Sequence, residues 1–144
     1  MRANFNSEIL NSMSRRFVTS ADLEIEHIDG KTHHWYYKQG LGDSDSLVLC
    51  RARVVKGAGH PFHTHPEMDE IIYVIEGEME QWLEKERRIL KAGESVYIPR
   101  GVVHGCYNLS DAECEFIAIL SPSKIRGEFS VDVSGEEPWK SLRL

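Results

Sequence analysis

The stretch that decides the fold is HPFHTHPEMDEIIYVIEG, residues 60–77. It places His63 and His65 two positions apart and adds Glu70 five positions later. Prolines at positions 61 and 66 disfavour a helix here, and in an extended strand residues i and i+2 face the same side. His63 and His65 therefore present their imidazoles to one face, which is half of a metal site.

A carboxylate is the usual complement to two imidazoles in such a site. Glu67, Asp69 and Glu70 are the local choices. The strand that follows is apolar in both phases, because Ile72 follows Glu70 and Ile71 follows Asp69 at strand spacing. Periodicity alone therefore leaves the choice of carboxylate open.

A second stretch, GESVYIPRGVVHGCYN, covers residues 93–108 and contains one more histidine, His104. Together the two stretches resemble the cupin superfamily, whose motifs are G-x5-H-x-H-x4-E-x6-G and G-x5-P-x-G-x2-H-x3-N. Every spacing is kept, and fifteen residues separate the motifs. The matching positions are Gly57, His63, His65, Glu70 and Gly77, followed by Gly93, Pro99, Gly101, His104 and Asn108.

This resemblance implies an antiparallel double-stranded β-helix, which is a jelly-roll barrel. It implies a single cupin domain over residues 1–144, with its motif core at 57–108. It also implies that His63, His65, Glu70 and His104 bind one divalent transition metal (Fe, Mn, Ni, Co, Cu or Zn), and that Glu70 doubles as a proton acceptor. The resemblance thus selects Glu70 among the three carboxylates.

The rest of the sequence supports an all-β fold by itself. Short alternating runs are separated by turns, and the Asp29-Gly30 pair is a strong hairpin signal. Helical spacing occurs only in residues 6–17, where we expect a short N-terminal helix. We expect Trp139, in the extended tail, to pack back onto the barrel.

Strand phase nominates further residues for a substrate pocket. Gln81 should point inward while Glu80 faces solvent, Cys106 shares the phase of His104, and Phe116 points in while Glu115 faces out. The predicted substrate-pocket residues are therefore Gln81, Cys106 and Phe116. His60 is expected in a surface turn, with a place at the mouth of the pocket as the alternative, and His27, His33 and His34 are expected to be exposed on the first hairpin.

The composition bears on the binding partners and the cellular compartment of the protein. The 144 residues carry a net charge of -6, which argues against nucleic acid as a partner, and no apolar run is long enough to span a membrane. The N-terminus lacks the apolar stretch of a signal peptide, and three cysteines without a CxxC pair suit a reducing compartment, so we expect a cytoplasmic protein.

The resemblance to the cupin superfamily further implies a small-molecule metalloenzyme of dioxygenase type. Two alternatives stay open: a non-redox metal-dependent isomerase, decarboxylase or lyase acting on a sugar or organic acid, and a non-catalytic barrel that binds a small ligand. We also expect a homodimer, because small barrels of this family often pair. Trp35, Tyr36 and Tyr37 are its candidate interface residues.

Overall fold

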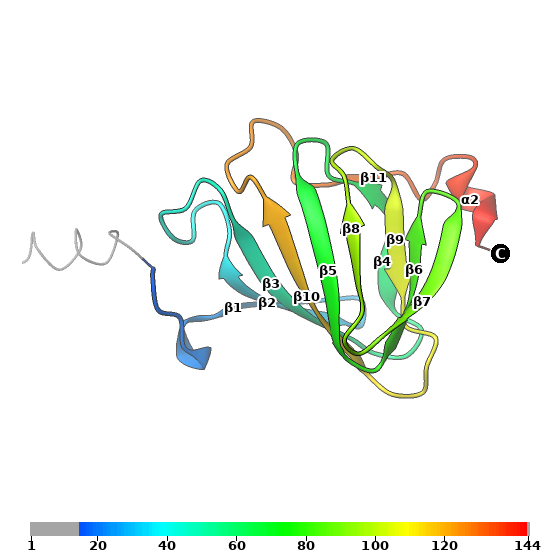
Figure 1. Ribbon diagram of the computed structural model, residues 1–144, viewed down its shortest axis with the longest axis horizontal. Coiled ribbons are helices and arrows are strands. Elements are labelled where there is room, and N and C mark those ends of the chain that lie inside the picture. Colours follow the sequence, from blue (N-terminus) through cyan, green and yellow to red (C-terminus); the bar gives the residue numbers. More distant parts are fainter. Residues whose placement is uncertain (1–14, 144) are drawn as a thin grey trace, which may run out of the picture.

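The computed structural model describes residues 15–143, which form two antiparallel sheets packed face to face (Figure 1). The six-stranded sheet has the order β1 (Glu24–Ile28), β2 (Lys31–Tyr37), β3 (Val48–Val54), β10 (Cys114–Ser121), β5 (Asp69–Glu76), β8 (Ser95–Ile98). The five-stranded sheet has the order β11 (Val131–Asp132), β4 (Gly59–Thr64), β9 (His104–Tyr107), β6 (Glu78–Leu83), β7 (Glu86–Lys91). Two short helical segments complete the elements, η1 (Ser20–Asp22) and α2 (Trp139–Leu142).

This arrangement confirms the all-β, double-stranded β-helix prediction. The hairpin prediction is also confirmed: β1 pairs with β2 through Asp29 and Gly30, whose φ angles of 46° and 76° are the left-handed values of a two-residue turn. Most of the predicted helix at residues 6–17 lies outside the described residues, and residues 15–17 are not helical. Within residues 15–143, no helix has the length and apolar character needed to cross a bilayer.

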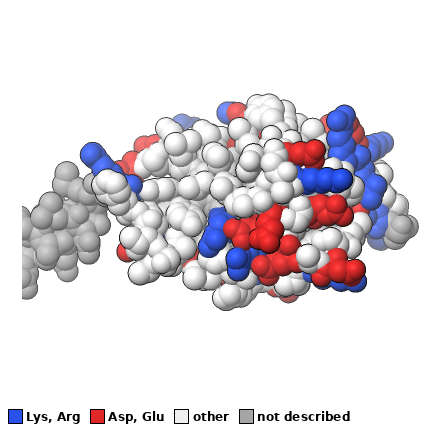
Figure 2. All heavy atoms as spheres, turned by 60° about the horizontal axis from the view of Figure 1, so that its bottom comes forward, with Lys and Arg blue, Asp and Glu red and all other residues white. Residues whose placement is uncertain are grey.

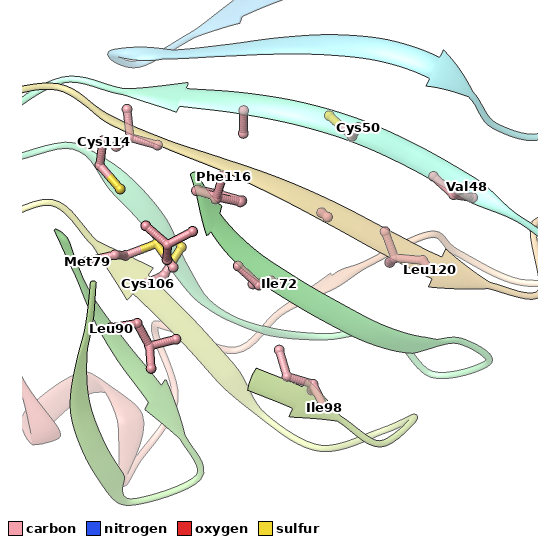
Figure 3. Close-up of a cluster of buried hydrophobic side chains, with 14 of the residues drawn as sticks. Val48, Cys50, Ile72, Met79, Leu90, Ile98, Cys106, Cys114, Phe116 and Leu120 are labelled. Atoms are coloured by element: carbon pink, nitrogen blue, oxygen red, sulfur yellow. The ribbon is translucent and has the colours of Figure 1, made fainter. Parts of the chain in front are cut away.

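The core lies between the sheets, where side chains of both layers meet (Figure 3). Alternation produces it, since every second residue of β3 is buried, and β5 alternates in the same way over most of its length. Ala52 and Ala118 of the six-stranded sheet are buried there and have small side chains. Both line the cavity described below.

Two glutamates depart from the sequence prediction. Glu80 and Glu115 were expected in solvent, yet their exposed fractions are 4% and 8%. Glu80 accepts hydrogen bonds from Trp82 Nε1, Arg87 and Arg143, at 2.6, 3.1 and 2.7 Å. Strand phase missed this because a carboxylate can be buried on the outer face of a sheet when charged donors surround it.

The segment after β11 covers part of the five-stranded sheet. Trp139 packs against Phe62 of β4, with ring centroids 5.6 Å apart, so the expectation that it returns to the barrel is confirmed. Arg143 lies 3.6 Å over the ring of Tyr107 and also binds Glu80. These contacts explain why β6 is buried on both of its faces.

Charged side chains are unevenly distributed over the surface. Figure 2 shows carboxylates gathered on one part of the face that it presents. The exposed carboxylates around the turns after β5, β7 and β9 are Glu76, Glu78, Glu94, Asp111 and Glu113. The net charge of -6 is thus partly concentrated around these turns.

Candidate metal centre

Three histidines and one glutamate converge between the two sheets. His63 lies in β4, His65 directly after β4, Glu70 in β5 and His104 at the start of β9. One ligand atom from each of the four lies within 4.8 Å of those of the others. The structure therefore brings together the set that the two motifs predicted.

Backbone carbonyls fix the protonation of all three rings. Nδ1 of His63 lies 2.7 Å from the carbonyl oxygen of Pro61, and Nδ1 of His104 lies 2.9 Å from that of Val102. Nδ1 of His65 lies 2.6 Å from the carbonyl oxygen of Phe129. Since a carbonyl oxygen only accepts, each Nδ1 carries the proton and each Nε2 keeps its lone pair.

The centre of the cluster consequently contains acceptors without donors. Oε2 of Glu70 lies 2.9 Å from Nε2 of His104 and 3.4 Å from Nε2 of His65. Within residues 15–143, Glu70 Oε2 and His104 Nε2 are buried and find no hydrogen-bond partner. Buried acceptors at this distance repel one another unless a cation lies among them, so the residues fit a metal ion. Three imidazoles and one carboxylate are a donor set suited to first-row divalent metals.

The electrostatics of the cluster agree with this donor set. Burial lowers the pKa of His63 to about 4, which keeps its ring neutral at pH 7. Burial would raise the pKa of Glu70, but a proton on Nε2 of His104 or His65 outweighs it and holds that pKa below its usual range, and a bound cation would take the place of that proton. Glu70 is therefore a carboxylate anion, and the site has the charge that a divalent cation needs.

A cavity of about 240 Å³ opens beside the four residues. This is the space of roughly eight molecules of liquid water, so it suits a small ligand. Most of its walls are apolar, and the polar groups are confined to the four residues, a few neighbours and the edge. The apolar lining consists of Trp35, Cys50, Ala52, Ile72, Cys106, Phe116, Ala118, Leu120 and Phe129.

The structure treats the three predicted pocket residues differently. Cys106 and Phe116 both line the cavity, so their contact with a substrate stays a prediction with a place in the structure. Gln81 is buried but is not among the lining residues, and it borders a separate hollow with Arg88 and Tyr97. The structure thus places Gln81 away from the cavity beside the metal residues, and its contact with a substrate stays a prediction.

His60 and His33 both line the cavity, whereas sequence reasoning preferred a surface turn for His60 and missed His33. His60 pairs with Cys106 on β9, and His63 pairs with His104, so Pro61 and Phe62 of β4 oppose the single residue Gly105 of β9. This β-bulge brings His60 and His63, which are out of phase by simple alternation, to the same face. A regular alternation along β4 could not predict this bulge. The spacing of two between His104 and Cys106 did predict that these two residues face the same side.

The fold and the residue set described above define a jelly-roll barrel with a candidate metal site, and comparison with known proteins agrees. The family model described as "Cupin domain" matches residues 50–120. The pectin degradation protein KdgF of Dickeya dadantii is 33% identical over 81 residues, which are 56% of this chain and 73% of KdgF. The chain therefore belongs to the cupin superfamily.

Two further relatives define the extent of the similarity. A germin-like protein of Arabidopsis thaliana is 38% identical over 128 residues, which cover 85% of this chain. The match spans 52% of that protein, so the chain corresponds to about half of its length. The structure of an RmlC-like cupin from Shewanella frigidimarina superposes with a TM-score of 0.66 at 27% identity, covering 78% of this chain and 96% of that one.

Proposed function

We propose that this chain is a metal-dependent enzyme that acts on a small, largely apolar molecule bearing one or two oxygen atoms. One observation carries the proposal: four acceptor atoms, with no donor among them, face one another beside an apolar cavity. A metal ion resolves the repulsion between these acceptors, and the cavity holds a ligand next to it.

The residues of the chain have distinct tasks in this proposal. The carbonyl oxygens of Pro61, Val102 and Phe129 hold the three rings with their Nε2 atoms inward. The apolar walls exclude water from the bound ligand, which strengthens electrostatic interactions inside the cavity. A first-row divalent ion bound there would supply a Lewis acid for a ligand oxygen and, if redox-active, a site for oxygen chemistry.

Glu70 fits the role of metal ligand better than that of proton acceptor. Its pKa lies below the usual range despite burial, because a proton on His104 or His65, or a bound cation in its place, brings positive charge next to the carboxylate. A carboxylate with a low pKa is a weak base at pH 7. We therefore keep Glu70 in the metal set and assign it no separate proton transfer.

Oxygenase chemistry remains the first reaction class, because apolar walls suit an enol, a diketone or a phenol better than a polyhydroxylated ligand. Its test is oxygen uptake by the iron-loaded protein with a panel of such substrates. Consumption of oxygen in step with substrate would support the assignment. Turnover that continues unchanged without oxygen would exclude it.

A non-redox reaction is the second candidate, and the similarity to KdgF favours it. That relative is named for pectin degradation, so a sugar-derived acid is a reasonable second substrate class. In this reaction the metal would act only as a Lewis acid. Turnover by the zinc-loaded protein under nitrogen would support this candidate over the oxygenase.

The experiment that tests the metal centre itself is metal content by mass spectrometry. The wild type, His65→Ala and His27→Ala are purified without chelators. We expect close to one metal per chain in the wild type and in His27→Ala, whose histidine lies exposed on β1. His65→Ala should lose most of it. Full occupancy in His65→Ala would show that the ligand set is wrong.

We also propose a homodimer. Trp35 lines the cavity and so turns away from the solvent, which makes it a poorer interface residue than expected. The outer face of the six-stranded sheet supplies a better one: Ile119, Ile71 and Tyr97 lie side by side across β10, β5 and β8 and are 38%, 42% and 57% exposed. Light scattering on the wild type and on Ile71→Glu tests this, and a monomeric wild type would refute it.

A further inference from the structure

A chain of three side chains leads from the cavity wall toward the solvent. Nε2 of His60 lies 2.8 Å from Nε2 of His33, and Nδ1 of His33 lies 3.1 Å from Oε2 of Glu26. All three residues line the cavity, yet the exposed fraction of the side chain rises from 13% at His33 to 45% at Glu26. The three residues, named the relay here, come from β4, β2 and β1.

The carboxylate at the outer end dictates where the protons lie. A carboxylate only accepts, so Nδ1 of His33 donates to Glu26 and Nε2 of neutral His33 carries a lone pair. That lone pair accepts the Nε2–H of His60, whose ring is inclined by only 20° to that of His33. Nδ1 of His60 is thereby left as an acceptor, and it lies 3.4 Å from the sulfur of Cys106.

We propose that His60 accepts a proton from a hydroxyl-bearing ligand in the cavity, and that His33 and Glu26 are positioning residues that fix its tautomer and connect it to the surface. The proposal rests on the proposed metal-dependent function, because it assigns the proton acceptor of the same cavity. Neither hydrogen-bond partner of His60 belongs to the four-residue metal set.

The transfer balances without a further reactant. The O–H bond of the ligand breaks, and a new N–H bond forms at Nδ1 of His60, where the ligand hydroxyl replaces the weak thiol donor. The proton on Nε2 of His60 passes to Nε2 of His33. The ligand stays in the cavity as an oxyanion, whose charge a cation held by the four metal residues would stabilise, and His33 becomes an imidazolium cation beside the carboxylate of Glu26.

The surroundings of His60 favour the neutral ring that such an acceptor needs. Burial is the largest effect on its pKa, which lies well below the usual value, so the ring is neutral before the transfer and passes the proton on to His33 rather than keeping it. The positive charge of Lys31, which donates to the carbonyl oxygen of Gly59, acts in the same direction. Other titratable groups also face His60. They are Lys31 and His33 of β2, His63 of β4, Glu70 of β5 and Cys106 of β9.

A relay of this kind explains contacts that packing alone does not require. Imidazoles that only filled space would not need a nearly coplanar N–H···N bond followed by a carboxylate. The order acceptor, imidazole, imidazole, carboxylate is the arrangement by which a carboxylate orients a histidine base. Here a second ring extends the arrangement from the cavity to the edge of the barrel.

The first test reads the tautomers directly by nitrogen-15 NMR of the ring nitrogens in the full chain without added metal. In the wild type we expect protonated Nε2 in His60 and protonated Nδ1 in His33. Glu26→Gln should turn both rings into tautomer mixtures, since an amide can donate as well as accept. Glu24→Gln, two positions away on β1 and also exposed, should change neither. The opposite tautomer in wild-type His60, or no response to Glu26→Gln, would overturn the relay.

The second test counts protons. Catechol binding to the zinc-loaded protein is followed by calorimetry in buffers of different ionisation enthalpy. The wild type should release about one proton fewer than His60→Gln, because the relay retains it, and His27→Gln should behave as the wild type. Equal release in wild type and His60→Gln would overturn the proposal. Failure to bind zinc would instead overturn the proposed function, while the NMR result would still decide the relay.

Discussion

At the residue scale, a backbone carbonyl decides which nitrogen of each histidine can bind a cation. Pro61 and Val102 each lie two residues before the histidine whose ring they hold, so these two contacts are local. Phe129 lies 64 residues from His65, so the third contact requires the completed fold. The metal centre is thus prepared partly by the strands themselves and partly by the segment after β10.

The crowding of acceptors around Glu70 predicts that Glu70→Gln changes the stability of the protein in opposite directions without and with a bound metal. Glu70→Gln supplies an N–H donor for Nε2 of His104, which lies 2.9 Å from Oε2 in the wild type. Without metal, the variant should therefore be more stable than the wild type by about 1 kcal/mol. With zinc, the order should reverse, because an amide is a poor ligand. Denaturant titrations of both proteins, with zinc and with EDTA, measure this, and a variant less stable in EDTA would contradict it.

The sequence predicted the four metal residues because their types and spacings form a fixed pattern over residues 57–108. It did not predict His60, because one extra residue in β4 changes the phase of the strand. Nor did it predict His33, whose role appears only when β2 lies beside β4 and the two rings meet. Local patterns are readable from sequence, whereas bulges and contacts between strands distant along the chain are not.

At the scale of elements, two motif glycines allow a matched comparison. Gly77, between β5 and β6, has a φ of 77°, and a Cβ there would lie 2.9 Å from the carbonyl oxygen of Glu113. Gly93 has a φ of 89° but open space around it. Both bear the cost of a left-handed φ on substitution, but only Gly77 adds a steric clash with the backbone.

Gly93→Ala should therefore destabilise the protein by about 1–2 kcal/mol, the cost of a left-handed residue with a side chain. Gly77→Ala should cost more, because either β5–β6 or the turn before β10 must move. Urea unfolding of the two variants beside the wild type is the measurement. Equal losses would mean that the turn before β10 yields easily and that the contact at Gly77 is unimportant.

Alternation predicted most of the strands, and the structure confirms them. The exceptions are residues whose outer face is covered by another element. Glu80 is the clearest example, because Arg143, after α2, reaches it over a separation of 63 residues. A period of two shows which residues share a face, but it does not show which face of a strand a later segment will cover.

For the whole molecule, Glu80 and Glu115 predict how stability varies with pH. Burial would raise the pKa of both, but hydrogen bonds from Trp82 and Arg143 to Glu80, and from Arg53 to Glu115, outweigh it and lower the pKa. A lowered folded-state pKa gives stability that is complete above the unfolded value of about 4.3 and is lost as the pH falls through the folded value.

We therefore expect the free energy of unfolding to begin to fall as the pH approaches about 4.3, the pKa of an unfolded glutamate. It should continue to fall as the pH drops toward the lower pKa values of the folded state. Glu80→Gln should be less stable than the wild type at pH 7 and should lose less on acidification. Glu78→Gln, exposed on the same strand, is the control and should follow the wild type. Parallel curves for Glu80→Gln and the wild type would show that Glu80 contributes nothing to the acid response.

Metal binding should also stabilise the molecule as a whole, because only the folded chain brings the four residues together. At a free zinc concentration 100 times the Kd, the gain is about 2.7 kcal/mol. For a chain of this size that corresponds to a rise in Tm of roughly 5–10 °C. Thermal melts with zinc and with EDTA measure it, and His63→Ala should show almost no difference between the two.

The size of the cavity has a consequence for inhibitor design. A space of about 240 Å³ lies below the roughly 300–1,000 Å³ of pockets that hold drug-sized compounds. A molecule that fits has few atoms, and the best small ligands gain at most about 1.5 kcal/mol per non-hydrogen atom. Most of that gain would have to come from a bond to the metal, so a fragment screen against metal-free protein would find little. A useful inhibitor library for this chain would consist of small chelators, screened on the loaded protein.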